Sequence, residues 1–388
     1  MSSGAFKFHR PTLAQTYCEA LEGNSILDAR SGLFLAAPRR TGKSTFLRED
    51  MRPAMELRGW TTVYIDLWTE KESSPAILIA REVRKSLTLF SGVISKLAKA
   101  TGLEKVTVFG ALSLSMASLS LPENVSLADA LEALVDASNK PVAVIVDEAQ
   151  HALNSKEGIE AMFGLKAARD RLNQGAAGQR LYLVFTGSNQ DKLTQLVLKR
   201  NQPFFGCRIT KFPPLGKDFS DAFTQYINQK LASNNQFNQD NVFDAFKLVG
   251  HRPELLRNLI AELALDGVAS NLSVELQLQA ASFRKRIWSE IESEFAALTP
   301  VQKAVLQRML QTGAQFTPFG EESLKAYSAL AGQPVDAAAA QGALKGLREK
   351  NLVWQAAYGD YALEDESMFS WYQHRRDIPP EKQTPELI

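Results

Sequence analysis

A nine-residue stretch near the amino terminus has the residue types needed to bind phosphate. Residues 37–45 read Ala-Pro-Arg-Arg-Thr-Gly-Lys-Ser-Thr and lie between an apolar run and a helical pattern. In this phosphate-loop context a glycine lets the backbone turn, amide groups point at phosphate oxygens, and the helix N-terminus adds positive charge. We expect Lys43 to reach the β- and γ-phosphates and the Ser44 hydroxyl to bind Mg²⁺. The predicted cofactors are ATP and Mg²⁺, held by Pro38, Arg39, Arg40, Thr41, Gly42, Lys43, Ser44 and Thr45.

The first position of this motif departs from the usual pattern. The motif asks for glycine at position 37, where the chain has Ala37. Alanine tolerates positive φ less well than glycine. We therefore expect the loop to begin with a slightly altered geometry.

Two adjacent carboxylates follow the most apolar run of the chain, residues 142–146. Ligands of parallel sheets bind in the crevice at the carboxyl ends of the strands. We expect Asp147 to hold Mg²⁺, directly or through water, and Glu148 to orient and polarise the attacking water. The alternative is an ordinary strand followed by a solvated acidic turn, which the upstream phosphate loop disfavours.

A further strand, residues 181–185, ends in the polar sequence Thr-Gly-Ser-Asn. A hydroxyl or amide at this point could donate a hydrogen bond to the γ-phosphate or position the water, and Ser188 is the candidate catalytic residue. The segment reads equally well as a strand-to-helix turn with Asn189 as the N-cap.

Strands alternate with helices up to residue 214, which predicts βαβ units and a mostly parallel sheet. Beyond residue 214 the pattern predicts helices only, until two short strand-like pieces near residues 352–354 and 360–363. We expect strands at 33–37, 61–67, 142–146, 181–185 and near 209, a strand pair within 105–121, and helices at 11–29, 43–58, 74–100, 126–138, 157–174, 217–232, 239–249, 252–265, 272–296, 299–312, 321–332 and 336–349.

Composition excludes several classes of protein. Lys and Arg total 44 against 43 Asp and Glu, so the chain is not one large basic surface. The two cysteines, Cys18 and Cys207, lie far apart, and the four histidines are scattered, which disfavours a disulfide scaffold and a structural zinc site. The longest apolar runs are strand-sized, so no membrane span is predicted. We expect a reducing compartment, the cytoplasm.

The phosphate loop, the Asp-Glu-Ala-Gln sequence at 147–150 and the Thr-Gly-Ser sequence at 186–188 together resemble the AAA+ ATPases. Within that class they resemble the archaeal-type branch of the signal-transduction (STAND) ATPases, which is similar to the origin-recognition initiators. The resemblance extends over roughly residues 5–375 and implies slow or partner-stimulated ATP hydrolysis. It implies a P-loop α/β domain at 1–215, a helical lid at 216–296, a winged helix at 297–375 and a flexible tail at 376–388.

The resemblance also implies two functional arginines. The lid motif of the family, Gly-Gly-x-Pro, corresponds to Gly-His-Arg-Pro at 250–253, so Arg252 is the candidate second sensor of the γ-phosphate. Arg257, one turn further on, and a plain surface arginine are the alternatives. Arg208 is the candidate arginine finger, acting on a neighbouring chain, within its own chain, or only structurally.

The net charge of the carboxyl-terminal region helps to decide whether the partner of this chain is DNA or a protein. If the winged helix bound DNA, the helix at 337–347 would enter the major groove. Residues 298–388 contain nine Lys and Arg against eleven Asp and Glu, and phosphate neutralisation dominates DNA affinity. A protein partner or self-association is therefore favoured over DNA. Three hypotheses remain: a nucleotide-gated switch that hydrolyses ATP, a DNA-handling ATPase of initiator or transposition-helper type, and a nucleotide-binding interaction module with negligible turnover.

Overall fold

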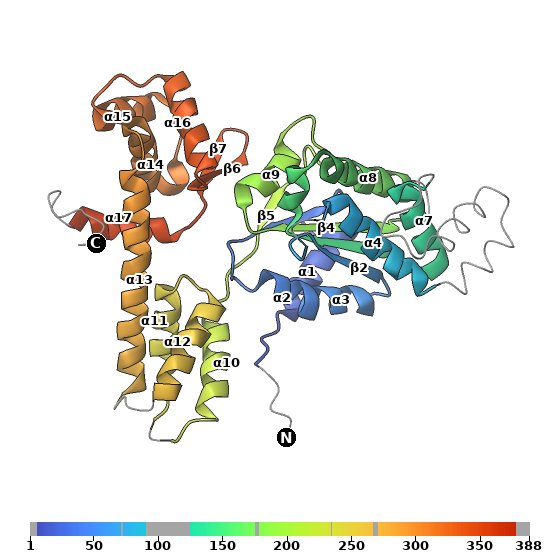
Figure 1. The fold of residues 1–388 in the computed structure, drawn as a ribbon, viewed down its shortest axis with the longest axis horizontal. Coiled ribbons are helices and arrows are strands. Elements are labelled where there is room, and N and C mark those ends of the chain that lie inside the picture. Colours follow the sequence, from blue (N-terminus) through green and yellow to red (C-terminus); the bar gives the residue numbers. More distant parts are fainter. Residues whose placement is uncertain are drawn as a thin grey trace. The chain divides into compact units, whose positions relative to one another are not determined.

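The computed structural model describes residues 6–70, 73–90, 125–174, 178–233, 235–266 and 271–377 (Figure 1). The strand pair expected within 105–121 lies outside these residues. The chain divides into two compact units. The sheet unit consists of His9–Ala37 and Lys43–Phe212, and the helical unit of the described parts of Met1–Phe8, Pro38–Gly42 and Pro213–Ile388.

The sheet unit is built on a five-stranded sheet in which every strand pair is parallel. Its strands lie in the order β2-β3-β4-β1-β5. β1, β3 and β4 are buried along their whole length, which explains why they read as continuous apolar runs rather than alternating ones. The strands are β1 (Leu33–Ala36), β2 (Thr61–Asp66), β3 (Val142–Asp147), β4 (Leu181–Gly187) and β5 (Ile209–Lys211).

Helices cover both faces of this sheet, α1 to α3 on one face and α4, α7 and α8 on the other (Figure 1). The predicted helix at 43–58 is interrupted by a π-helical turn, Leu47–Met51. Ser126 caps α7 in a capping box. The helices of this unit are α1 (Pro11–Glu22), α2 (Lys43–Phe46), α3 (Arg52–Leu57), α4 (Pro75–Thr88), α7 (Leu127–Ser138), the 3-10 helix η2 (Ala149–Asn154), α8 (Lys156–Leu172) and α9 (Gln190–Leu198).

The register of the strands determines which side chains meet at the carboxyl edge of the sheet. Asp66 at the end of β2 is paired with Asp147 at the end of β3. Ala36 at the end of β1 is paired with Gly187 at the end of β4. The segments that follow β1, β3 and β4 therefore leave the sheet at one common edge.

The helical unit has two apolar cores, and α13 contributes to both. The order helix, helix, helix, strand, strand after residue 299 agrees with the sequence prediction. Trp288 and Trp371 are buried in the second core. The last helix continues to Asp377, so residues 376 and 377, expected to begin the flexible tail, are helical. The elements are α10 (Lys217–Asn228), α11 (Gln239–Leu248), α12 (Pro253–Asp266), α13 (Leu272–Ala296), α14 (Pro300–Thr312), α15 (Glu321–Ala331), α16 (Ala337–Glu349), β6 (Val353–Ala357), β7 (Asp360–Leu363) and α17 (Ser367–Asp377).

Among the helices described, none has the length and apolar character needed to cross a membrane.

Candidate functional site

Glu148 stands at the point where β3 ends and η2 begins. Its backbone is left-handed, with φ 56° and ψ 41°, a conformation that costs a residue with a side chain roughly 1–2 kcal/mol. The preceding residue, Asp147, is the last residue of the buried strand. This turn places two carboxylates in succession at the carboxyl edge of the sheet.

Both oxygens of the Glu148 carboxylate accept hydrogen bonds. The Lys43 ammonium lies 3.2 Å from Oε1. Oε2 accepts from the Ser188 hydroxyl at 2.7 Å, from the Ser188 amide at 3.3 Å and from the Gln150 amide nitrogen at 2.5 Å. The structure therefore brings together three predicted site residues: Lys43 at the start of α2, Glu148 in the turn after β3 and Ser188 in the turn after β4.

The electrostatics of this cluster keep Glu148 ionised. The side chains of Lys43 and Glu148 are only 5% and 16% exposed. Burial pushes the pKa of Glu148 upward, but the Lys43 charge and the hydrogen bonds from Ser188 and Gln150 outweigh it, so the pKa lies below its usual value. Each buried charge has the other as its counter-ion, since an isolated buried charge would be strongly destabilising.

Asp147 is 1% exposed and is held by three donors. The Tyr64 hydroxyl donates to Oδ2 at 2.8 Å, and the Glu148 amide donates to Oδ1 at 3.1 Å. The Thr186 hydroxyl also donates to Oδ1. Thr186 was one of the hydroxyls expected to reach the phosphate or the water, and it binds Asp147 instead.

Tyr64 was not singled out from the sequence. Burial, then the Asp147 charge and hydrogen bond, raise the pKa of its hydroxyl well above the usual value, so it remains a donor. The one signal in the sequence was its position, since Tyr64 lies two residues before the end of β2. The sequence does not show that β2 pairs with β3, so the contact of Tyr64 with Asp147 could not be predicted.

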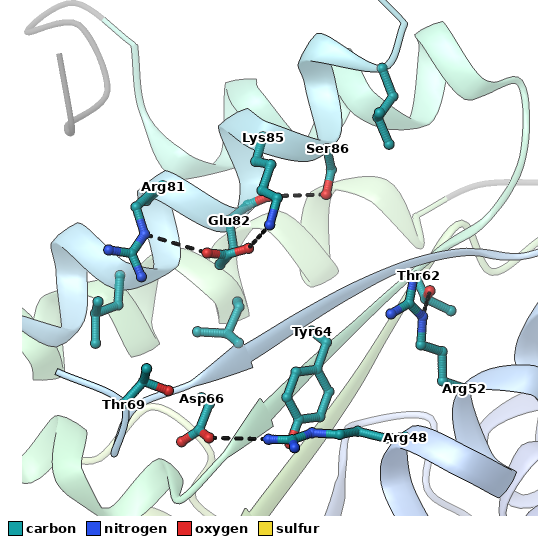
Figure 2. Close-up of a pocket in the computed structure, with 13 residues that line it drawn as sticks. Arg48, Arg52, Thr62, Tyr64, Asp66, Thr69, Arg81, Glu82, Lys85 and Ser86 are labelled. Carbon is teal, nitrogen blue, oxygen red and sulfur yellow. Dashed lines mark hydrogen bonds and ion pairs between the residues drawn. The ribbon is translucent and has the colours of Figure 1, made fainter. Parts of the chain in front are cut away.

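A cavity of about 420 Å³ lies beside Tyr64, between β2 and the helices α3 and α4 (Figure 2). In it the Arg48 guanidinium lies 5.1 Å from the centre of the Tyr64 ring and 3.4 Å from Asp66. The other cations that line the cavity also pair with carboxylates. These pairs are Arg52–Glu56, Arg81–Glu70 and Lys85–Glu82, at 2.8, 2.6 and 3.7 Å.

The residue with unusual backbone geometry in the phosphate loop is Arg40, not Ala37. Arg40 has φ 66° and Gly42 has φ 85°, whereas Ala37 is not among the described residues with positive φ. The Ala37 amide donates to the Gly187 carbonyl at 3.2 Å and so continues the sheet. The alanine in place of the motif's glycine therefore adds no strain at that position.

The remaining loop residues differ in exposure. The Thr41 hydroxyl donates to the Pro38 carbonyl at 2.9 Å, within the loop. The Arg40 guanidinium lies 3.5 Å from the carboxylate of Glu254 at the start of α12. Arg39, Arg40 and Thr45 are exposed, and Pro38, Gly42 and Ser44 are half-buried.

The segment after β4 serves two purposes. Asn189 accepts a hydrogen bond from the Lys192 amide at 2.8 Å and is the N-cap of α9. Ser188, one residue earlier, donates to Glu148. The N-cap interpretation is therefore confirmed for Asn189, whereas a contact of Ser188 with the γ-phosphate or the water stays a prediction.

The two candidate arginines lie in different units. Arg208, in the sheet unit, is exposed and directly precedes β5. Arg252, in the helical unit, directly precedes α12, and its guanidinium lies 2.9 Å from Asp365, which follows β7. Its neighbour His251 is left-handed, with φ 54°, and its Nδ1 lies 2.9 Å from the Leu215 carbonyl. Arg257 is exposed on α12.

No protein-family model and no curated protein matches this chain. Solved structures do match it. The Walker-type ATPase PABY2304 of Pyrococcus abyssi aligns with a TM-score of 0.55 at 18% identity, over 95% of this chain and 96% of that chain. The ORC2 protein of Aeropyrum pernix in its ADP form aligns with a TM-score of 0.50 at 15% identity, over 88% and 85%. This likeness confirms the predicted α/β fold class, a parallel sheet flanked by helices and followed by a helical carboxyl-terminal region.

Proposed function

We propose that this chain is an ATPase that binds ATP with Mg²⁺ at residues 38–45 and uses it as a nucleotide-gated switch. The observation that carries the proposal is the contact of Lys43 with Glu148 at the edge where β1, β3 and β4 end. The first residue has the position of a phosphate-binding lysine, and the second that of a water-activating carboxylate. The fold, shared with a Walker-type ATPase and with ORC2 in its ADP form, supports the proposal.

Lys43 has two alternative partners in this scheme. Without nucleotide its charge is balanced by Glu148. The phosphates of ATP carry more negative charge than one carboxylate, so Lys43 turns to them and leaves Oε1 of Glu148 open. Oε2 keeps the donors from Ser188 and Gln150. The open oxygen then accepts a hydrogen bond from the attacking water and polarises it.

The oxygen atoms of Ser44 and Asp147 are suitable ligands for a magnesium ion. Ser44 offers a hydroxyl and Asp147 a carboxylate, and Mg²⁺ prefers oxygen ligands while keeping several of its waters. Three donors already occupy the Asp147 carboxylate, so it would act through one of those waters rather than directly. When bound, the ion would neutralise charge on the β- and γ-phosphates.

The switch would run through Arg252. Its ion pair with Asp365 joins the start of α12 to the segment between β7 and α17. An arginine that exchanges Asp365 for the γ-phosphate would link the nucleotide state to the carboxyl-terminal region, for which we propose a winged helix on a helical lid. A switch of this kind works by populating one of two arrangements of a contact.

For the partner we propose a protein or a second copy of this chain. The excess of carboxylates in residues 298–388 repels a phosphate backbone. Arg208, exposed at the start of β5, would be available to a neighbouring copy as an arginine finger.

This function is tested by measuring phosphate release from ATP in the presence of Mg²⁺. The measurement is made with and without DNA and over a range of protein concentrations. We expect turnover that rises with protein concentration and is unchanged by DNA. Stimulation by DNA would favour the DNA-handling hypothesis. ATP binding without turnover above that of Glu148→Gln would favour a binding module.

A further inference from the structure

Gln150 lies inside the candidate site, where the scheme so far uses it only as a donor to Glu148. It is in η2, two residues after Glu148, and is 2% exposed. Its amide nitrogen donates to Oε2 of Glu148 at 2.5 Å and lies 3.4 Å from the Ser188 hydroxyl. Its carbonyl oxygen is buried without a hydrogen-bond partner in the part of the chain that the structure describes.

The backbone around Gln150 leaves little room for another arrangement. A Cβ atom at Gly187 would come within 2.6 Å of the Gln150 carbonyl oxygen. Glycine at the end of β4 therefore makes space for this amide against the strand. A buried carbonyl without a partner is costly, and an apolar side chain of the same length would avoid that cost.

The orientation of the amide follows from the charge beside it. Turning the amide over would place its carbonyl oxygen against the ionised Glu148 carboxylate and would leave its N–H groups without an acceptor there. The NH₂ group must therefore face Glu148. Burial of the Gln150 carbonyl without a partner is destabilising, and the arrangement that causes it also holds Oε2 of Glu148 in place.

The two oxygens of Glu148 differ in the kind of partner they have. Among the residues that the structure describes, Oε2 accepts from uncharged donors only, namely Gln150 and the hydroxyl and amide of Ser188. Oε1 has the Lys43 ammonium, which the proposed function assigns to the nucleotide phosphates. Departure of Lys43 thus opens Oε1 and leaves Oε2 held.

We propose that Gln150 is a positioning residue for the hydrolytic step, which fixes Oε2 of Glu148 so that Oε1 is directed at the attacking water. This inference rests on the proposed ATPase function. Gln150 acts only through Glu148 and does not touch the nucleotide. Its loss should therefore slow hydrolysis without weakening ATP binding.

The test compares wild type with Gln150→Met, which keeps the length of the side chain and removes the donor. We expect kcat to fall about tenfold, the effect of losing one hydrogen bond to a charged group. KM for ATP and the affinity for a fluorescent ATP analogue should stay within about twofold of wild type, since transition-state interactions affect kcat alone. Ser188→Ala removes another donor to the same oxygen and should give the same split, which covers the case that Gln150→Met fails to fold.

A double variant separates positioning from a general structural effect. In a Glu148→Gln background, adding Gln150→Met should leave the residual turnover unchanged, because the residue it positions is gone. Thr194→Val is the matched control: it removes a buried hydroxyl of α9 that donates to the Gln190 carbonyl at 2.8 Å, away from Glu148. We expect its kcat and KM to equal those of wild type.

Unchanged kcat in both Gln150→Met and Ser188→Ala would overturn the inference, as would an equal loss in the wild-type and Glu148→Gln backgrounds. Those results would leave the ATPase function standing, provided that wild type releases phosphate much faster than Glu148→Gln does. A wild type that releases no phosphate contradicts the proposed function and the inference with it.

Discussion

The Lys43 ammonium and Oε1 of the Glu148 carboxylate lie 3.2 Å apart, in a site where both side chains are largely withdrawn from solvent. The two residues are 105 positions apart in sequence and meet because β1 and β3 leave the sheet at the same edge. The pair stabilises each charge in its buried position. It also means that any phosphate that binds Lys43 must compete with Glu148.

Removing the Lys43 ammonium group tests whether this residue binds the phosphates of ATP. Lys43→Ala should weaken ATP binding by about 100-fold or more, because a buried, charge-assisted contact to phosphate is lost. Titration with a fluorescent ATP analogue measures the change. Lys156→Ala is the control, since that side chain is 86% exposed on α8 of the same unit, and it should bind as wild type does. Normal ATP affinity in Lys43→Ala would rule out the site assignment.

Tyr64→Phe tests whether Asp147 serves a metal ion. The change removes the hydroxyl that donates to Oδ2 of Asp147 and keeps the ring against Arg48. We expect the Mg²⁺ concentration for half-maximal turnover to rise about tenfold, the usual effect of losing an outer partner of a ligand. Tyr182→Phe, on β4 and stacked on Trp60, is the control and should not shift it. An unchanged Mg²⁺ requirement in Tyr64→Phe would argue against a metal role for Asp147.

Asp365→Asn tests the proposed exchange of partners at Arg252. Both side chains are partly exposed, so breaking their ion pair should release Arg252 at a small cost in stability. ATP affinity should then increase by up to about fivefold, the range that such a pair supports. Asp360→Asn, on the exposed start of β7, should leave affinity unchanged. Weaker ATP binding by Asp365→Asn would show that the pair holds Arg252 in place for the nucleotide instead of withholding it.

Cys18 provides a pH-dependent test of the packing of α1. Burial raises the pKa of its thiol to about 11, with Arg58 opposing and Glu22 and Glu19 adding to the shift. At pH 8 the native thiolate is therefore about 100-fold scarcer than in the unfolded chain, and alkylation by iodoacetamide should be slower by at least that factor. Because the folded pKa is the higher one, the thiol's stabilising effect is complete below about pH 8.5 and is lost as the pH rises towards 11. Equal alkylation rates in native and urea-unfolded protein would contradict the buried position.

The sequence predicted the structure correctly where the structure depends on residues that are close together in the chain. The apolar runs that became β1, β3 and β4 are unbroken because these strands are buried on both faces, and their ends carry the polar residues of the site. Asn189 could be read as an N-cap because it directly precedes a helix, and it does cap α9. The α/β fold class followed from the alternation of strands and helices alone.

The rest depends on contacts between distant parts of the chain. Tyr64 reaches Asp147 only because β2 pairs with β3 in one particular register. Gln150 is part of the Asp-Glu-Ala-Gln sequence on which the resemblance rests, but the sequence does not show that its carbonyl oxygen lies against Gly187. Arg252 and Asp365 are 113 residues apart, and no local pattern predicts their ion pair. The roles proposed for Arg208 and Arg252 stay predictions.

The most direct test of the account is Glu148→Gln, measured for ATP binding and for phosphate release in the same preparation. The substitution keeps the size of the side chain and removes the negative charge that would activate water. We predict ATP affinity equal to or above that of wild type, because Lys43 no longer has a competing counter-ion, and turnover at least about 100-fold lower. Phosphate release at the wild-type rate by Glu148→Gln would contradict the central claim.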